Sequence, residues 1–139
     1  MESASSIKPA RKRAWYILGF ALVVALGLAS RRFPILFPAM LGKYPGDALW
    51  ALMVFLGFGV LFPRRPTLHI FIYTLVISYG VEFSKLYHAP WLDEFRSSTV
   101  GHLLLGSTFW WQNLVAYGIG AIIGVMIDRV AFRGFAEKL

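Results

Sequence analysis

Four apolar stretches, separated by short clusters of charged residues, set the strongest limit on what this chain can fold into. They cover residues 14–30, 47–62, 67–87 and 108–127. The hydrocarbon core of a bilayer is about 30 Å thick, and about 20 apolar residues cross it as a helix. Charged residues make up only 15% of the 139 residues, against about 25% in soluble domains. The sequence therefore predicts an all-α, polytopic membrane protein, a four-helix transmembrane bundle.

The segments outside these spans are short. Residues 1–13 form a basic arm, residues 14–127 the four-span transmembrane domain, and residues 128–139 a polar tail. The loop over 31–46 contains three prolines and a partly inserted apolar piece. Residues 91–107 are amphipathic but too short to cross a bilayer. We expect them to form a short extracytoplasmic interfacial or re-entrant segment.

The distribution of lysine and arginine predicts the orientation, because cytoplasmic loops are enriched in these residues. Nine of the 14 lie in the arm, in the connection between the second and third spans, and in the tail: Lys8, Arg11, Lys12, Arg13, Arg64, Arg65, Arg129, Arg133 and Lys138. The other five are Arg31, Arg32, Lys43, Lys85 and Arg96. We therefore expect a multi-pass membrane protein with both termini cytoplasmic.

Two alternatives concern the N-terminal region and the net charge of +7. The basic arm and first apolar run could be a signal peptide cleaved after Ala29, but the run is long for that purpose and arginines would follow the cut. A retained first span is favoured. A basic chain could also bind nucleic acid, but orientation in a membrane explains these charges. The expected partner is the lipid bilayer, with no nucleic acid.

Polar residues fall on one face of each of two spans. On the third span, Thr74, Ser78, Glu82 and Lys85 are spaced i, i+4, i+8 and i+11, which places them on one stripe of a helix. A second stripe, on the fourth span, comprises Asn113, Tyr117, Gly120 and Gly124. Glycines four residues apart allow close approach of two membrane helices. The stripes predict a bundle whose outer end contains a polar funnel walled by aromatic rings.

Ionisable residues near a membrane span are by default functional candidates. The ligand-binding candidates gather at the predicted outer end: Asp47, Glu82, Lys85, Tyr87, His88, Trp91, Asp93, Arg96 and His102. In this hypothesis the acids and bases bind polar groups and the aromatic rings form an apolar wall. The alternative is structural: these charges neutralise one another and fix the register of the helices.

Chemical signatures for catalysis, metals and cofactors are weak. His88, Asp93, His102 and Glu82 could be combined into a metal site, but their spacing matches no known ligand pattern. With no cysteine, a thiolate site is excluded. We therefore predict no metal and no cofactor, and we identify no catalytic residues.

Three strings carry a family resemblance: "RRFPILFPAMLGKYPGDALWALMVFLGFGVLFP", "VEFSKLYHAPWLDEFR" and "GHLLLGSTFWWQNLVAYGIG". Over about residues 31–125 the chain resembles the bacterial family DUF2809, whose function is unknown, and is distantly similar to VanZ-like membrane proteins. The VanZ-like features are Asp47, Glu82 and the later glycine pair. Two positions depart from that pattern: Lys85 stands where glutamine is expected and Asn113 where an acid is common. The resemblance implies a cell-envelope role on the outer face, since VanZ-like proteins are associated with resistance to teicoplanin-type glycopeptides.

Three functions are compatible with these features. The leading hypothesis is a non-enzymatic protein that binds an amphiphilic envelope component or glycopeptide-type drug. The second is an intramembrane enzyme on a lipid-linked substrate, with Glu82 as general base and His102 or Arg96 stabilising charge. The third is a subunit of a small transporter, which requires a homo-oligomer because four spans rarely form a pathway alone.

Overall fold

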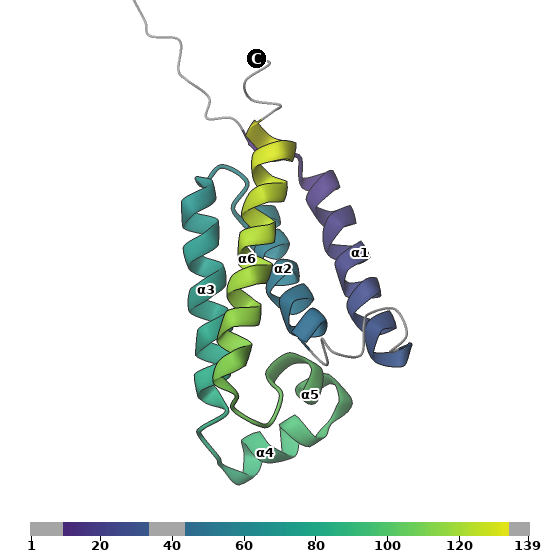
Figure 1. Ribbon diagram of the computed structural model, residues 1–139, viewed down its shortest axis with the longest axis vertical. Helices are drawn as coiled ribbons and strands as arrows, with labels where there is room; N and C mark the ends of the chain where they lie inside the picture. The colour runs from purple at the N-terminus through teal and green to yellow at the C-terminus, as the bar shows by residue number, and fades with distance from the viewer. Residues whose placement is uncertain (1–9, 34–43, 134–139) are drawn as a thin grey trace, which may run out of the picture.

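The structure is a computed structural model, which describes residues 10–33 and 44–133. Within these ranges every regular element is a helix (Figure 1). They are α1 (Arg13–Arg32), α2 (Tyr44–Leu61), α3 (Thr67–Ser84), α4 (Pro90–Ser97), α5 (Thr99–Leu105), α6 (Trp111–Asp128) and a π-helical turn, η3 (Arg129–Arg133). The predicted all-α class is confirmed.

The four predicted spans correspond to four long helices. α1, α2, α3 and α6 together with the start of η3 are each long and apolar enough to cross a membrane. Their bounds agree with the predicted spans to within two residues except at three ends. α2 begins at Tyr44 where the sequence predicted residue 47. α3 ends at Ser84 where the sequence predicted a span to residue 87, and α6 begins at Trp111 where it predicted residue 108.

At the end of α3 and at the start of α6, side chains from distant positions contact the backbone. The Arg96 guanidinium donates to the carbonyl oxygens of Ser84 at 2.6 Å and Tyr87 at 2.8 Å, at the end of α3. The Trp110 N–H, at the start of α6, donates to the Glu82 carboxylate at 2.8 Å. Backbone groups at helix ends lack partners within the helix. These contacts supply partners at the end of α3 and at the start of α6.

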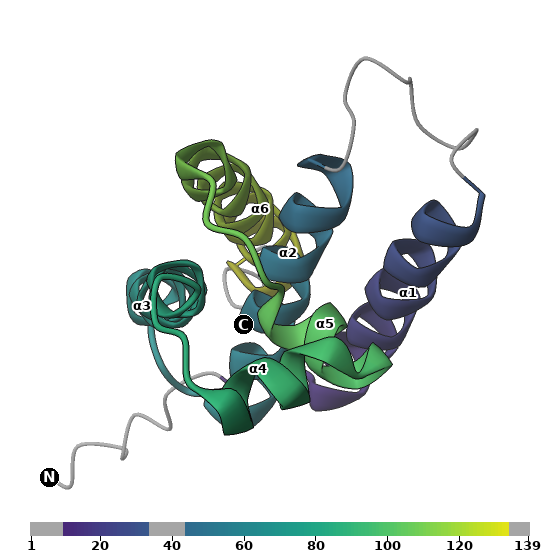
Figure 2. The same ribbon diagram turned by 90° about the horizontal axis from the view of Figure 1, so that it is seen from below.

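α2 is the central helix of the bundle. It packs against α1, α3 and α6, and α6 packs in turn against α3. Figures 1 and 2 show α1 on the far side of α2 from α3. The predicted interfacial segment forms the two short helices α4 and α5, which lie across one end of the bundle (Figure 1).

The predicted close approach of the fourth span is confirmed, and its partner is α2. A Cβ atom on Gly120 would lie 2.1 Å from the carbonyl oxygen of Ala48, and one on Gly124 would lie 2.5 Å from the ring of Phe55. Both distances are far below contact distance, so only glycine lets the two helices meet at this separation.

Some predictions fall outside the described residues. The partly inserted apolar piece of the 31–46 loop lies mostly within 34–43, and most of the basic arm lies within 1–9. The end of the predicted tail, residues 134–139, also lies outside them. In the described part of the arm, Arg11 is buried with 3% of its surface exposed, and Arg13 is the first residue of α1.

Candidate functional site

The two polar stripes face the interior of the bundle. Thr74, Ser78 and Glu82 of α3 have no exposed surface, and Lys85 is 7% exposed. Asn113, Tyr117, Gly120 and Gly124 of α6 are buried too. The stripes meet through Glu82, so the sequence placed these residues on the correct faces of their helices.

The Glu82 carboxylate is the centre of a buried network, which we call the Glu82 cluster: Glu82, Lys85, Trp110, Asn113 and Tyr117. Lys85 donates to Oε2 at 2.8 Å, and the Tyr117 hydroxyl donates to the same oxygen at 3.1 Å. The backbone N–H of Trp110 donates to Oε1, and the side-chain amide nitrogen of Asn113 lies 3.1 and 3.2 Å from the two oxygens. Every donor therefore converges on one carboxylate.

The surroundings of Glu82 stabilise a negatively charged carboxylate but do not suit a general base. It lies at the N-terminus of α6, where the positive end of the helix dipole favours negative charge. Both oxygens already accept hydrogen bonds, and the side chain has no exposed surface. A general base must reach the proton it removes from a substrate. This geometry favours the structural reading of Glu82 over the catalytic one.

Next to this cluster lies a cavity of about 930 Å³ between α1, α2 and the segment that contains α5. We call it the α1–α2 cavity. Three sequence-predicted site residues line it: Asp47, Lys85 and His102. The aromatic residues Trp50 and Tyr117 also line it, with their ring centroids 5.6 Å apart. The volume falls within the range of about 300–1,000 Å³ that is typical of small-molecule sites.

The remaining predicted site residues lie elsewhere. Tyr87 and Trp91 are 59% and 68% exposed and do not line the cavity. His88 Nδ1 lies 3.2 Å from Asp93 on the exposed side of α4. Arg96 is buried and holds the end of α3. The structure therefore brings together only part of the predicted set, and a ligand-binding role for these five stays a prediction.

In the described ranges 10–33 and 44–133, no group of three or more His, Asp or Glu side chains is close enough to hold a metal ion. Glu82 contacts Lys85 and other donors, while His88 and Asp93 pair with each other at the surface.

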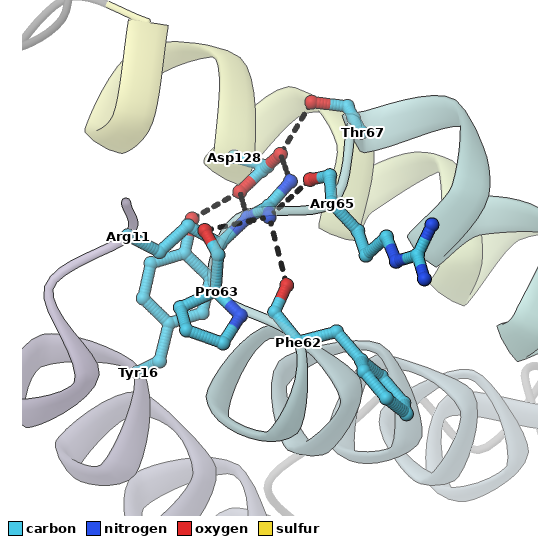
Figure 3. Close-up of polar contacts among 7 residues, drawn as sticks. All are labelled: Arg11, Tyr16, Phe62, Pro63, Arg65, Thr67 and Asp128. Atoms are coloured by element: carbon cyan, nitrogen blue, oxygen red, sulfur yellow. Dashed lines mark hydrogen bonds and ion pairs between the residues drawn. The ribbon is translucent and has the colours of Figure 1, made fainter. Parts of the chain in front are cut away.

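A second buried network, which the sequence analysis missed, occupies the opposite end of α6 (Figure 3). We call it the Asp128 cluster: Asp128, Arg11, Tyr16 and Thr67. The Arg11 guanidinium donates to both carboxylate oxygens of Asp128, at 2.7 and 2.8 Å. The Thr67 hydroxyl donates at 2.5 Å, and the Tyr16 hydroxyl donates to Oδ1. Three other segments of the chain therefore converge on one acid at the end of α6.

Arg11 also holds the turn between α2 and α3. Its Nη1 donates to the carbonyl oxygens of Arg65 at 2.5 Å, Pro63 at 3.3 Å and Phe62 at 3.4 Å. Burial alone would lower the pKa of Arg11, but the hydrogen bonds and charge of Asp128 raise it above its ordinary value. The guanidinium is therefore charged at any physiological pH and acts as a permanent clamp.

One signal in the sequence pointed to this cluster. Asp128 ends the last apolar stretch, on the side of the membrane where nine lysines and arginines were counted. A lone acid at the boundary of a span requires a cation. Several basic residues were available, and nothing in their spacing singled out Arg11.

Comparison with known proteins locates the chain among families but adds no function. No solved structure matches it significantly. A family model described as "Protein of unknown function (DUF2809)" matches residues 36–121, which include the whole Glu82 cluster but not Arg11, Tyr16 or Asp128. The match extends over more than half of the chain, from residue 36, between α1 and α2 in sequence, well into α6. The chain therefore belongs to the DUF2809 family.

Proposed function

We propose that this protein binds an amphiphilic molecule in the α1–α2 cavity. The observation that carries the proposal is the composition of the cavity wall, which is apolar along the spans and charged at one end. The apolar part comes from α1 and α2: Val23, Val24, Leu28, Leu49 and Met53. The polar part is formed by residues at helix ends and beyond: Arg31, Asp47, Lys85 and His102.

This division matches an amphiphile oriented along the bundle axis. Arg31 lies in the last turn of α1 and Asp47 in the first turn of α2, at the same end of the bundle. An apolar chain would lie between α1 and α2, and a polar head would meet the charges. Trp50 adds a donor, because its buried Nε1 has no hydrogen-bond partner among the described residues. A few placed polar groups in an apolar pocket are typical of ligand sites.

The proposed setting is the bacterial cytoplasmic membrane, with both termini cytoplasmic and the cavity toward the outer face. The excess of basic residues in the arm, the α2–α3 turn and the tail supports this orientation. Similarity to VanZ-like proteins supports a cell-envelope ligand, of which a glycopeptide-type drug is one example. We propose binding rather than catalysis by Glu82, since both oxygens of its carboxylate already accept hydrogen bonds.

A cavity-filling substitution tests the proposal. Gly27 lines the cavity, and a Cβ atom there would meet nothing within 4 Å, so Gly27→Leu adds side-chain volume at a position with open space. Gly80 on α3 also has open space around it but does not line the cavity, so Gly80→Leu is a matched control. Both changes raise helix propensity by a similar amount.

The measurement is photocrosslinking of the purified full chain in nanodiscs. The probe is a phospholipid with a diazirine on its acyl chain, and crosslinked peptides are mapped by mass spectrometry. We expect crosslinks to α1 and α2 cavity residues to fall severalfold in Gly27→Leu and to change less than twofold in Gly80→Leu. Equal labelling of the cavity peptides in the two variants would show that no amphiphile occupies it.

A strain lacking the gene tests the envelope role. If the cavity serves a cell-envelope function, Gly80→Leu restores wild-type susceptibility to teicoplanin-type glycopeptides and Gly27→Leu does not. Restoration by both variants at equal expression would contradict a role for the cavity in that phenotype.

A further inference from the structure

A second, smaller cavity lies at the opposite end of the bundle, at the turn between α2 and α3. Its volume is about 400 Å³. The described residues that line it are Arg13, Leu61, Phe62, Pro63, Arg64, Arg65, Pro66 and His69. Three of them are arginines and one is a histidine, and none of the described lining residues is acidic. We call this the turn cavity.

The arginines of the turn cavity are not neutralised by ion pairs with acidic side chains of the described residues. Arg64 and Arg65 are adjacent and exposed, and no ion pair joins either of them to a described residue. Arg13 uses its Nε to donate to the carbonyl oxygen of Val60 at 3.0 Å, which fixes the side chain without neutralising it. Like charges held close together repel one another. A bound anion would relieve that repulsion.

The backbone of the turn is held in place from behind by the Asp128 cluster. Arg11 donates to the carbonyl oxygens of Phe62, Pro63 and Arg65. In Figure 3 the Arg65 carbonyl faces Arg11, while its guanidinium points away from the cluster. The clamp therefore engages the backbone of the turn and leaves the Arg65 side chain available to an anion.

Two further features favour an anion at this place. α3 begins at Thr67, directly after the turn, so the positive end of its dipole is near the cavity. The turn joins two spans, so it lies at the depth where a membrane meets water. Arginine binds phosphate oxygens through paired, charge-assisted hydrogen bonds.

We infer that the turn cavity binds a phosphate group, supplied by the headgroup of an anionic membrane lipid or by a soluble phosphate compound. Arg64, Arg65 and Arg13 would contact the phosphate oxygens. This site is independent of the α1–α2 cavity, because the two cavities share no lining residue.

The test compares two single substitutions at the same end of the bundle. Arg64→Gln removes a cation from the turn cavity, while Arg129→Gln removes one from an exposed position in η3 that does not line it. The full chain is purified in detergent and titrated with phosphatidylglycerol, phosphatidylcholine or inorganic phosphate. Lipid binding is measured by native mass spectrometry and phosphate binding by calorimetry. Thermal midpoints confirm that the variants are folded.

A surface arginine contributes roughly a fivefold change in affinity for an anionic lipid. We expect Arg64→Gln to weaken phosphatidylglycerol binding about fivefold and Arg64→Gln/Arg65→Gln about 25-fold. Arg129→Gln should change it less than twofold. Arginine-dependent binding of inorganic phosphate would assign the site to a soluble compound. Arginine-dependent preference for phosphatidylglycerol without phosphate binding would assign it to the lipid. Equal losses in Arg64→Gln and Arg129→Gln, or no preference for phosphatidylglycerol over phosphatidylcholine without arginine-dependent phosphate binding, would overturn the inference.

Discussion

Both ends of α6 meet a buried carboxylate, and the two sites solve the same electrostatic problem differently. Glu82 of α3 lies at the N-terminus of α6, and Asp128 is the last residue of α6. Each carboxylate accepts from one cation and one tyrosine hydroxyl. The cation of Glu82 is three residues away in sequence, whereas the cation of Asp128 is 117 residues away.

The helix dipole explains why the two carboxylates need different support. Negative charge is favoured at a helix N-terminus and disfavoured at a C-terminus. Glu82 therefore gains from α6 itself, through the Trp110 N–H. Asp128 has the opposite position and relies on two hydrogen bonds from Arg11, together with the hydroxyls of Tyr16 and Thr67. Its cluster also joins α1 to the rest of the bundle, where α1 otherwise packs chiefly against α2.

The largest expected effect is the loss of Asp128. Asp128→Asn leaves the buried Arg11 charge without its counterion, and breaking a buried pair from one side costs about 3–5 kcal/mol. We expect the free energy of unfolding in detergent to fall by that amount. Replacing both partners, as in Arg11→Met/Asp128→Leu, should recover most of the loss because no charge is then left unpaired. A double variant as unstable as Asp128→Asn would contradict this account.

Glu82→Gln should cost less, about 1.5–3 kcal/mol, as expected for hydrogen bonds to a charged group. Glutamine still offers an oxygen to the Trp110 N–H. Lys85, left without its partner, has a long flexible side chain at the edge of the α1–α2 cavity and can move its ammonium toward water. The same unfolding measurement checks the ranking. A Glu82→Gln loss as large as that of Asp128→Asn would remove the distinction between the two ends of α6.

Between the two clusters, the contact of α6 with α2 sets the separation of the helices. Gly120→Ala would place a methyl group 2.1 Å from the carbonyl oxygen of Ala48, so the helices must move apart. Overpacking of this kind costs about 1–3 kcal/mol. Gly80→Ala is the control, since its methyl group meets nothing within 4 Å and should be neutral or slightly stabilising. Equal stability of the two variants would show that α2 and α6 do not depend on this contact.

The contrast between the clusters also shows what sequence reasoning can reach. The spans, the inward stripe through Thr74, Ser78 and Glu82, and the glycine pair of α6 follow from hydrophobicity and helical period, which are local properties. The Glu82–Lys85 pair was predictable for the same reason. The pairing of Arg11 with Asp128 was not, because it depends on how the first and last helices come together. Arg11 was assigned to the arm only because it precedes the first apolar run.

The candidate site was predicted in part, for a related reason. Asp47, Lys85 and His102 were chosen for their charge near span ends, and they do line one cavity. Tyr87 and Trp91 were predicted as the apolar wall of the same site, but they are exposed outside the cavity. The difference arises because Arg96 contacts the end of α3 from α4, which changes the direction of the chain after Ser84. Such long-range side-chain contacts to backbone have no periodic signal in the sequence.

The smallest expected effect isolates one hydrogen bond of the Asp128 cluster. Thr67→Val keeps the shape of the side chain but removes the hydroxyl that donates to Asp128 at 2.5 Å. Polar contacts between membrane helices contribute about 0.6 kcal/mol on average and at most about 1.7 kcal/mol.

Thr74→Val is the matched control in the same helix, since the Thr74 hydroxyl donates only to the Ile70 carbonyl of its own helix, 2.8 Å away. That hydrogen bond reaches no second helix, and its acceptor is a backbone carbonyl of α3 itself. We therefore expect Thr67→Val to lower the unfolding free energy by about 0.6 kcal/mol and Thr74→Val to leave it nearly unchanged. If Thr74→Val is the more costly of the two, helix-to-helix contact at Asp128 is not what stabilises this end of the bundle.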